Sequence, residues 1–76
     1  MTPAESILEA LQRQGFGVVN GDTEYVIISK DARRQHQVPA RTFTGNDKVS
    51  LVALRILVTG LEMLEGFTAP PGFWRE

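Results

Sequence analysis

The stretch from Lys48 to Leu64 constrains the fold more than any other part of this 76-residue chain. On a helix with about 100° per residue, four of its polar residues and the glycine that follows fall on one narrow stripe. That stripe holds Lys48, Arg55, Thr59, Glu62 and Gly66. Apolar residues cover almost all of the remaining surface, whereas a surface helix needs an apolar face of only about 100° or slightly more. The surplus apolar area predicts a further protein surface that covers it.

Two structures stay open for this stretch, because valine and isoleucine also favour strands. One is a single helix of 17 residues, and the other is a strand near Val49–Leu54 followed by a shorter helix. Length favours the single helix, since buried strands usually run for about 4–8 residues. Asn46 or Asp47 can cap its start, and Gly66 suits the left-handed position that follows a helix end.

A chain of this length predicts one domain, with residues 1–66 as the domain and residues 67–76 as a C-terminal tail. So short a chain buries a small share of its surface and is marginally stable without reinforcement. Because it has no cysteine and only one histidine, we expect no disulfide, no metal and no cofactor. Oligomerisation is the remaining common reinforcement, and a homodimer is the expected form.

The N-terminal residues lack the basic start and apolar run of a signal peptide. Arg55 interrupts the most apolar stretch, so we expect no membrane span. These features favour a soluble protein located in the cytoplasm. The net charge of −1 does not suggest bulk attraction to nucleic acid.

The first expected element is a helix that begins near Thr2. Thr2 can serve as its N-cap, Pro3 suits the first helical position, and Glu5 stands where a capping box needs an acidic partner. An apolar stripe of Ala4, Ile7, Leu8 and Leu11 follows. We expect Gly15 to end this helix.

Three strands are expected next, over residues 16–19, 23–29 and 35–42. Asn20-Gly21 predicts a type I′ hairpin turn between the first two, because both central positions of that turn need positive φ. The second strand is apolar on both faces, with Tyr25 and Ile27 on one and Val26 and Ile28 on the other. It is therefore expected to be central and covered on both sides. Pro39 places the third strand at an edge.

The expected fold class is α+β, in the order helix-strand-strand-strand-helix. A three-stranded antiparallel sheet carries both helices on one face, and an extended aromatic tail follows. Two alternatives stay open for this tail: it folds back on the domain, or it docks on a partner.

The order of the expected elements and the residues at their turns resemble those of the HicA-like mRNA interferase toxins, which have a double-stranded-RNA-binding-like fold. The resemblance extends from Ile7 to about Phe67 and includes Gly15-Phe16, Gly21, Val38-Pro39 and Gly60-Leu61. The family carries Gly-Ser-His-His or a close variant at the second strand, and that histidine is catalytic. This chain has Gly21-Asp22-Thr23-Glu24 there, so the resemblance implies a binding fold without the ribonuclease activity.

No catalytic residue is predicted. His36 is able to act as a general base near neutral pH, but it lacks a recognisable carboxylate partner and is more typical of a solvated edge. The acids Asp22, Glu24 and Asp31 lie at turns, where acids are ordinary, so neither acid–base chemistry nor a metal site follows from them.

Two sets of candidate binding residues remain. The middle of the chain is locally basic, and a phosphate-contacting set would be Lys30, Arg33, Arg34, Arg41 and Lys48. A partner-binding set combines the second strand with the tail aromatics: Val26, Ile28, Phe67, Phe73 and Trp74. The first hypothesis is a small non-enzymatic, prokaryotic-type domain that acts through protein association as a homodimer. The alternative is an RNA-binding module derived from a HicA-like fold.

Overall fold

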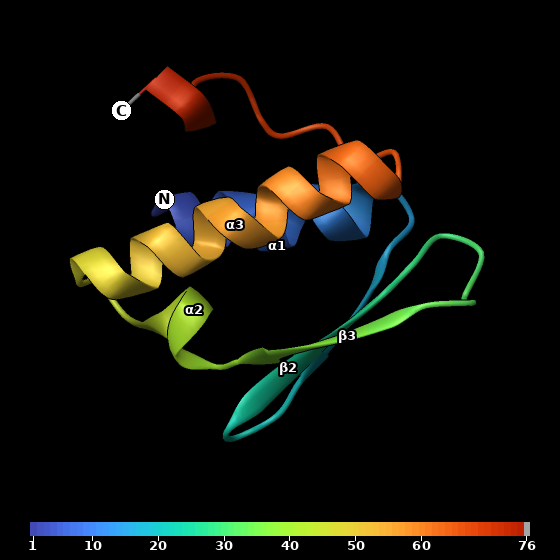
Figure 1. The fold of residues 1–76 in the computed structure, drawn as a ribbon, viewed down its shortest axis with the longest axis horizontal. Helices are drawn as coiled ribbons and strands as arrows, with labels where there is room; N and C mark the ends of the chain where they lie inside the picture. The colour runs from blue at the N-terminus through green and yellow to red at the C-terminus, as the bar shows by residue number, and fades with distance from the viewer. Residues whose placement is uncertain (76) are drawn as a thin grey trace.

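The computed structural model describes residues 1–75, so Glu76 of the predicted tail lies outside it (Figure 1). The chain forms helix α1 (Pro3–Arg13), strands β1 (Gly17–Asn20), β2 (Glu24–Ile28) and β3 (Gln35–Pro39), and helices α2 (Arg41–Thr44) and α3 (Lys48–Leu64). A 3-10 turn, η1 (Phe73–Arg75), follows in the tail. The predicted order and the α+β class are confirmed, with α2 as an additional short helix.

Both long helices begin at caps that the sequence specifies. The Glu5 amide donates to Thr2 Oγ1 at 3.1 Å, and the Thr2 amide donates to Glu5 Oε1 at 2.8 Å, which completes the predicted capping box. At α3 the Ser50 amide donates to Asp47 Oδ1 at 2.9 Å. Gly66 follows α3 with φ +71°. The single helix over 48–64 is therefore confirmed, and the alternative strand near Val49 is wrong.

The three strands form one antiparallel sheet in the order β1-β2-β3, so β2 is central and Pro39 lies on an edge strand, as predicted. Both long helices lie on one face of this sheet (Figure 1). Tyr25 and Ile27 are buried beneath them. Val26 and Ile28 are only half-buried on the opposite face. The expectation that β2 is covered on both sides is therefore wrong, because no element of residues 1–75 covers that face.

The hairpin between β1 and β2 exists, but its turn differs from the predicted one. Asn20 pairs with Tyr25, and the Gly21 amide donates to the Glu24 carbonyl oxygen at 3.0 Å. The turn is therefore centred on Asp22 and Thr23, and Gly21 does not have positive φ. A Cβ at Gly21 would lie 2.7 Å from the Glu24 carbonyl oxygen. Glycine is needed here for close backbone approach and not for a type I′ conformation.

Strand β3 ends at Pro39, before the predicted limit of Thr42. Ala40 already has helical φ and ψ and leads into α2. Phe43 of α2 is buried, with its ring centroid 4.9 Å from that of Tyr25. Burial of this aromatic side chain beside β2 accounts for the early turn into a helix.

The tail folds back along the domain, and Phe67 and Phe73 are its buried residues (Figure 1). Phe67 packs edge-on against Phe16 with centroids 5.8 Å apart. The Gln14 side chain donates to the Thr68 carbonyl oxygen at 2.8 Å and accepts from the Thr68 amide at 3.0 Å. Of the two alternatives for the tail, the structure contains the folded-back one.

Candidate functional site

Helix α3 has two apolar faces that point in opposite directions. The inner face, with Leu54, Val58 and Leu61, is at most 2% exposed and completes the core. The opposite face carries large apolar side chains that remain in solvent. Their exposed fractions are 70% for Val49, 47% for Val52, 68% for Ile56 and 77% for Met63. We refer to these four residues as the outer face of α3.

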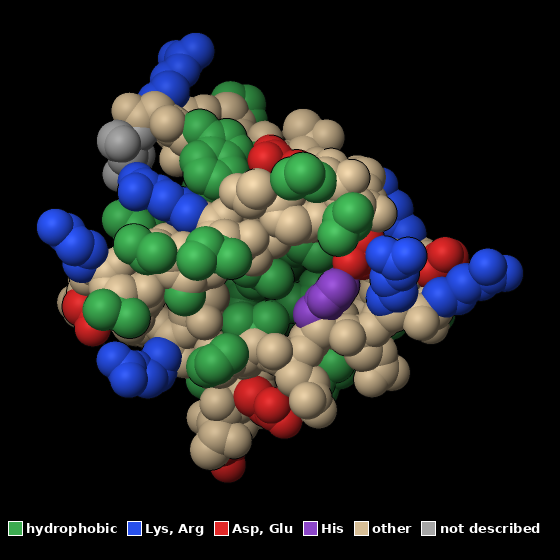
Figure 2. Space-filling view, viewed as in Figure 1, with side chains coloured by type: hydrophobic (Ala, Val, Ile, Leu, Met, Phe, Trp, Pro, Cys, Tyr) green, Lys and Arg blue, Asp and Glu red, His purple; other side chains and the backbone are tan. Residues whose placement is uncertain are grey.

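The outer face has the spacing of a helix–helix seam. Val49, Val52 and Ile56 are separated by three and then four residues, and Met63 follows one heptad after Ile56. Thr59, which is exposed, occupies the remaining position of the repeat. Such a repeat keeps its members on one side of a helix over many turns. Figure 2 shows separate hydrophobic side chains standing out along α3 in this view.

The two flanks of the outer face differ in chemistry. One flank has the small residues Ala53 and Gly60, and a Cβ at Gly60 would meet nothing within 4 Å. The other flank has Arg55 and Glu62, which stand seven residues apart on the polar stripe. A second helix is therefore able to approach closely on one side and to form ion pairs on the other.

The tail lies beside the outer face and leaves it uncovered. Trp74 Nε1 donates to Glu62 Oε2 at 3.2 Å, and the Trp74 ring packs edge-on against Phe73 with centroids 4.9 Å apart. Trp74 remains 47% exposed. This contact fixes the tail at the polar flank of α3, and Val49, Ile56 and Met63 stay in solvent.

The predicted partner-binding residues do not form one surface. Phe67 and Phe73 are buried within their own chain, so they are not available to a partner. Val26 and Ile28 lie on the open face of the sheet. Only Trp74 lies next to the outer face of α3, through Glu62. The surplus apolar area of this helix was predicted, but the predicted binding residues did not include Val49, Val52, Ile56 and Met63. The heptad spacing is the signal that would have found them.

The predicted basic residues fall into two groups at opposite ends of α3. Lys30, Arg33 and Arg34 lie in the β2–β3 loop, near the C-terminal end of α3. Arg41 and Lys48 lie near its N-terminal end, where Arg41 forms an ion pair with Asp47 at 3.5 Å. A helix of 17 residues spans about 25 Å, so one chain does not bring the five together. Figure 2 shows Lys and Arg side chains at both ends of this view.

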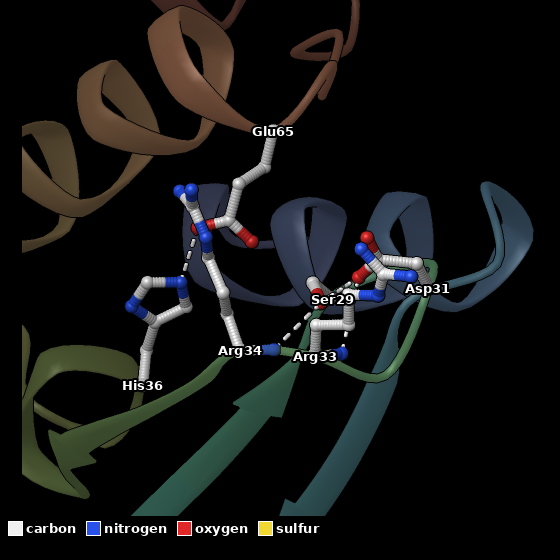
Figure 3. Close-up of polar contacts among 6 residues, drawn as sticks. All are labelled: Ser29, Asp31, Arg33, Arg34, His36 and Glu65. Carbon is white, nitrogen blue, oxygen red and sulfur yellow. Dashed lines mark hydrogen bonds and ion pairs between the residues drawn. The ribbon is translucent and has the colours of Figure 1, made fainter.

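The β2–β3 loop is held in one conformation by its own polar groups (Figure 3). Asp31 Oδ1 accepts from the Ser29 hydroxyl at 2.7 Å and from the Arg33 amide at 3.0 Å. These two hydrogen bonds hold the pKa of Asp31 below its ordinary value of 3.8, and the bond from Ser29 has the larger effect. The Ser29 hydroxyl also accepts from the Arg34 amide at 3.0 Å. This arrangement presents the exposed side chains of Arg33 and Arg34 on a fixed support.

Lys30 connects the same loop to the end of α3. Its Nζ donates to the Gly66 carbonyl oxygen at 3.0 Å and lies 5.4 Å from the centroid of the Phe16 ring. A cavity of about 220 Å³ lies beside it, lined by Ser29, Lys30, Asp31, Arg34, Leu64 and Glu65. The Lys30 ammonium group is therefore already bound within its own chain, by the Gly66 carbonyl oxygen, and is less available for contact with a phosphate.

His36 has a carboxylate partner, contrary to the expectation of a solvated edge residue. It pairs with Ile27 in the sheet register and so faces the helices. Its Nε2 forms a hydrogen bond with Oε2 of Glu65, the residue that ends α3 (Figure 3). The Glu65 side chain is 5% exposed, and its Oε1 has no hydrogen-bond partner among residues 1–75. The pair ties the edge strand β3 to the end of α3.

Comparison of the chain with protein-family models, curated proteins and solved structures found no match. The resemblance to HicA-like toxins therefore stays a prediction from the sequence. Within residues 1–75, no helix has the length and apolar character needed to cross a membrane. The same part of the chain contains no group of three or more His, Asp or Glu side chains placed to hold a metal ion.

Proposed function

We propose that this chain is a small non-enzymatic association domain that works as a homodimer and buries the outer face of α3 between its copies. The supporting observation is that four large apolar side chains stay in solvent at heptad spacing while the core beneath α3 is complete. Removing apolar surface from water contributes about 25 cal/mol per Å². The outer face therefore offers binding energy that folding of one chain leaves unused.

The size of this surface suits a small specific interface. Two copies that cover the outer face and its flanks would bury on the order of 1,000 Å² in total, which is near the lower bound for specific association. What distinguishes these side chains from scattered surface apolar residues is their alignment along one side of a single helix, which is the pattern of a helix–helix seam. The open sheet face is the weaker candidate surface, because its central apolar residues, Val26 and Ile28, are already half-buried. They pair with β1 on one side and with the exposed polar residues Gln37 and Gln35 on the other.

The test is the mass of the protein in solution, measured by light scattering from low to high micromolar concentration. We expect the native chain to reach twice its 8.4 kDa, and Ile56→Glu to remain at 8.4 kDa. Ile56 is exposed, so its replacement leaves the core intact. Val19→Glu is the matched control, because Val19 is an exposed apolar residue on the open sheet face, and it should dimerise like the native chain. A native chain that stays monomeric at high micromolar concentration would overturn the proposal.

RNA binding through the β2–β3 loop is the second candidate function. It is supported by the exposed, adjacent Arg33 and Arg34 on a loop held by Ser29 and Asp31, and by the resemblance to HicA-like toxins. Phosphate contacts are strongest at low salt. We expect a structured RNA hairpin to bind at low salt and to dissociate as salt rises. The double variant Arg33→Gln and Arg34→Gln should bind more weakly, whereas Arg13→Gln on α1 should not. Absence of binding at low salt would exclude this candidate.

A further inference from the structure

We infer that the two copies of α3 pack antiparallel, with Arg55 of each chain facing Glu62 of the partner subunit. This inference rests on the proposed homodimer and adds the orientation and register of its interface. The observations that carry it are the heptad spacing of the outer face, the charges on one flank and the small residues on the other.

The apolar seam forms in an antiparallel register that also pairs opposite charges, whereas a shift by one heptad would set Arg55 against Arg55 of the partner subunit. When a two-fold axis passes midway between the levels of Leu57 and Val58, Val52 faces Met63 of the partner subunit. Ile56 then faces Thr59 of the partner subunit, and the symmetry repeats both pairs. Each pair combines the first and fourth positions of the heptad, which is the arrangement that antiparallel helices require, and Thr59 is the one polar member. Three of the four outer-face residues are buried at the centre of this interface, and Val49 lies at its rim.

The charges favour this orientation over a parallel one. In the antiparallel register the polar flanks of the two helices meet, so Arg55 lies opposite Glu62 of the partner subunit, and two equivalent ion pairs form. In a parallel pair the polar flank of one helix meets the small-residue flank of the other. Arg55 would then lie beside Gly60 of the partner subunit, and Glu62 would face no cation. In antiparallel packing, the positive N-terminal end of each helix dipole also lies beside the negative C-terminal end of the other.

The second flank allows the helices to approach closely. Ala53 lies opposite Gly60 of the partner subunit in the same register, and neither side chain separates the backbones. The Cβ position of Gly60 is open space in the single chain, which leaves room for the methyl group of Ala53 from the other copy. Small residues at such positions let two helices pack at short distance.

Glu62 is held in place for this role before association. Its Oε2 accepts a hydrogen bond from Trp74, and a carboxylate has about four acceptor sites on its two oxygens. An arginine from the second copy is therefore able to bind without displacing Trp74. Because the carboxylate is already oriented, less side-chain entropy is lost when the ion pair forms.

Cysteine cross-linking tests the orientation, since the chain has no cysteine of its own. Val52→Cys and Met63→Cys are prepared separately and then mixed under mild oxidation. The antiparallel register predicts a disulfide-linked dimer in the mixture and little in either variant alone. Val52 positions of the two copies would lie about 16 Å apart along the axis, well beyond disulfide reach. Self-linking of Val52→Cys alone would show parallel packing and overturn the inference, while the homodimer itself would stand.

Charge exchange provides the second test. Arg55→Glu places like charges opposite each other at both pairs, so we expect the dimer dissociation constant to rise about tenfold at low salt. The double variant Arg55→Glu and Glu62→Arg restores opposite charges in the antiparallel register and should recover most of that loss. No recovery would contradict the register. A native chain that never dimerises would instead overturn the proposed function, so the two failures are distinguishable.

Discussion

The His36–Glu65 pair concentrates stability in two side chains that lie 29 positions apart in sequence. We expect His36→Ala to lower the free energy of unfolding by about 2 kcal/mol, because it leaves the buried Glu65 carboxylate without its hydrogen-bond partner. The measurement is urea unfolding in the Ile56→Glu background, where association does not contribute. The double variant His36→Leu and Glu65→Met removes both polar groups and should recover most of the loss. A loss of less than about 0.5 kcal/mol in the single variant would contradict this role.

Asp47, the N-cap of α3, gives stability a defined pH dependence. The hydrogen bond from the Ser50 amide lowers the pKa of Asp47 from its ordinary value of 3.8, with Arg41 adding a smaller electrostatic contribution. Its folded pKa therefore lies below its unfolded pKa, so the stabilisation is fully present at neutral pH. That contribution is lost as pH falls below 3.8 and through the folded value.

Asp47→Asn isolates this effect, because asparagine keeps an acceptor oxygen for the helix cap but does not titrate. We expect the free energy of unfolding of the native chain to fall more steeply than that of the variant between neutral pH and pH 3. Glu5 and Asp31, whose pKa values are also lowered, are present in both chains and cancel in the comparison. Equal slopes for the two chains would show that the Asp47 cap does not depend on its charge.

At the scale of elements, the α2–α3 connection depends on a glycine for space. Gly45 has φ −76°, which any residue adopts, but a Cβ there would lie 2.1 Å from Ser50 Oγ and 2.8 Å from the Arg41 carbonyl oxygen. Gly45→Ala should therefore lower the free energy of unfolding by about 2 kcal/mol. Gly60→Ala is the contrasting variant, because its Cβ meets nothing within 4 Å and alanine favours a helix interior by about 1 kcal/mol.

Both glycine variants are measured by urea unfolding in the Ile56→Glu background, so that contacts between copies do not enter. We expect opposite signs, with Gly45→Ala less stable and Gly60→Ala more stable than the parent. If Gly45→Ala unfolded at the same urea concentration as the parent, the close packing of the α2–α3 connection would be in doubt.

The helices were predictable from the sequence because their ends are encoded locally. Thr2, Asp47 and Gly66 specify caps through contacts within a few residues of themselves. The β1–β2 turn was misplaced because Gly21 serves a close approach, and Asn-Gly alone does not distinguish that need from positive φ. Helix α2 was missed because it depends on the burial of Phe43 against Tyr25, which lies far away in the chain.

The candidate surface was predictable only as an amount of apolar area. Periodicity shows that α3 has more apolar surface than one face of a helix requires, but it does not show which side packs on the sheet. That choice depends on the packing of Leu54, Val58 and Leu61 into a core whose other members lie far away in the sequence. The Glu65 partner of His36 escaped prediction for the same reason.

At the scale of the whole molecule, the proposed self-association would make thermal stability depend on concentration. A single chain of 76 residues buries a modest share of its surface, so the proposed interface on α3 would contribute a large fraction of the total stability. When folded chains pair and unfolded chains do not, mass action favours the folded state as concentration rises. Folding and association are then one equilibrium, and the midpoint of thermal unfolding reports both.

We therefore expect the unfolding midpoint of the native chain to rise by about 5–10 °C for a hundredfold increase in concentration. Circular dichroism at 222 nm and the fluorescence of Trp74, the single tryptophan, measure this transition. Trp74 lies against Glu62 at the edge of the proposed interface, so its emission should also shift with concentration at temperatures below the midpoint. Ile56→Glu should unfold at one temperature at all concentrations, and Val19→Glu should keep the dependence. If the midpoint of the native chain did not change with concentration and its mass in solution were that of one chain, self-association would not explain the exposed apolar face of α3.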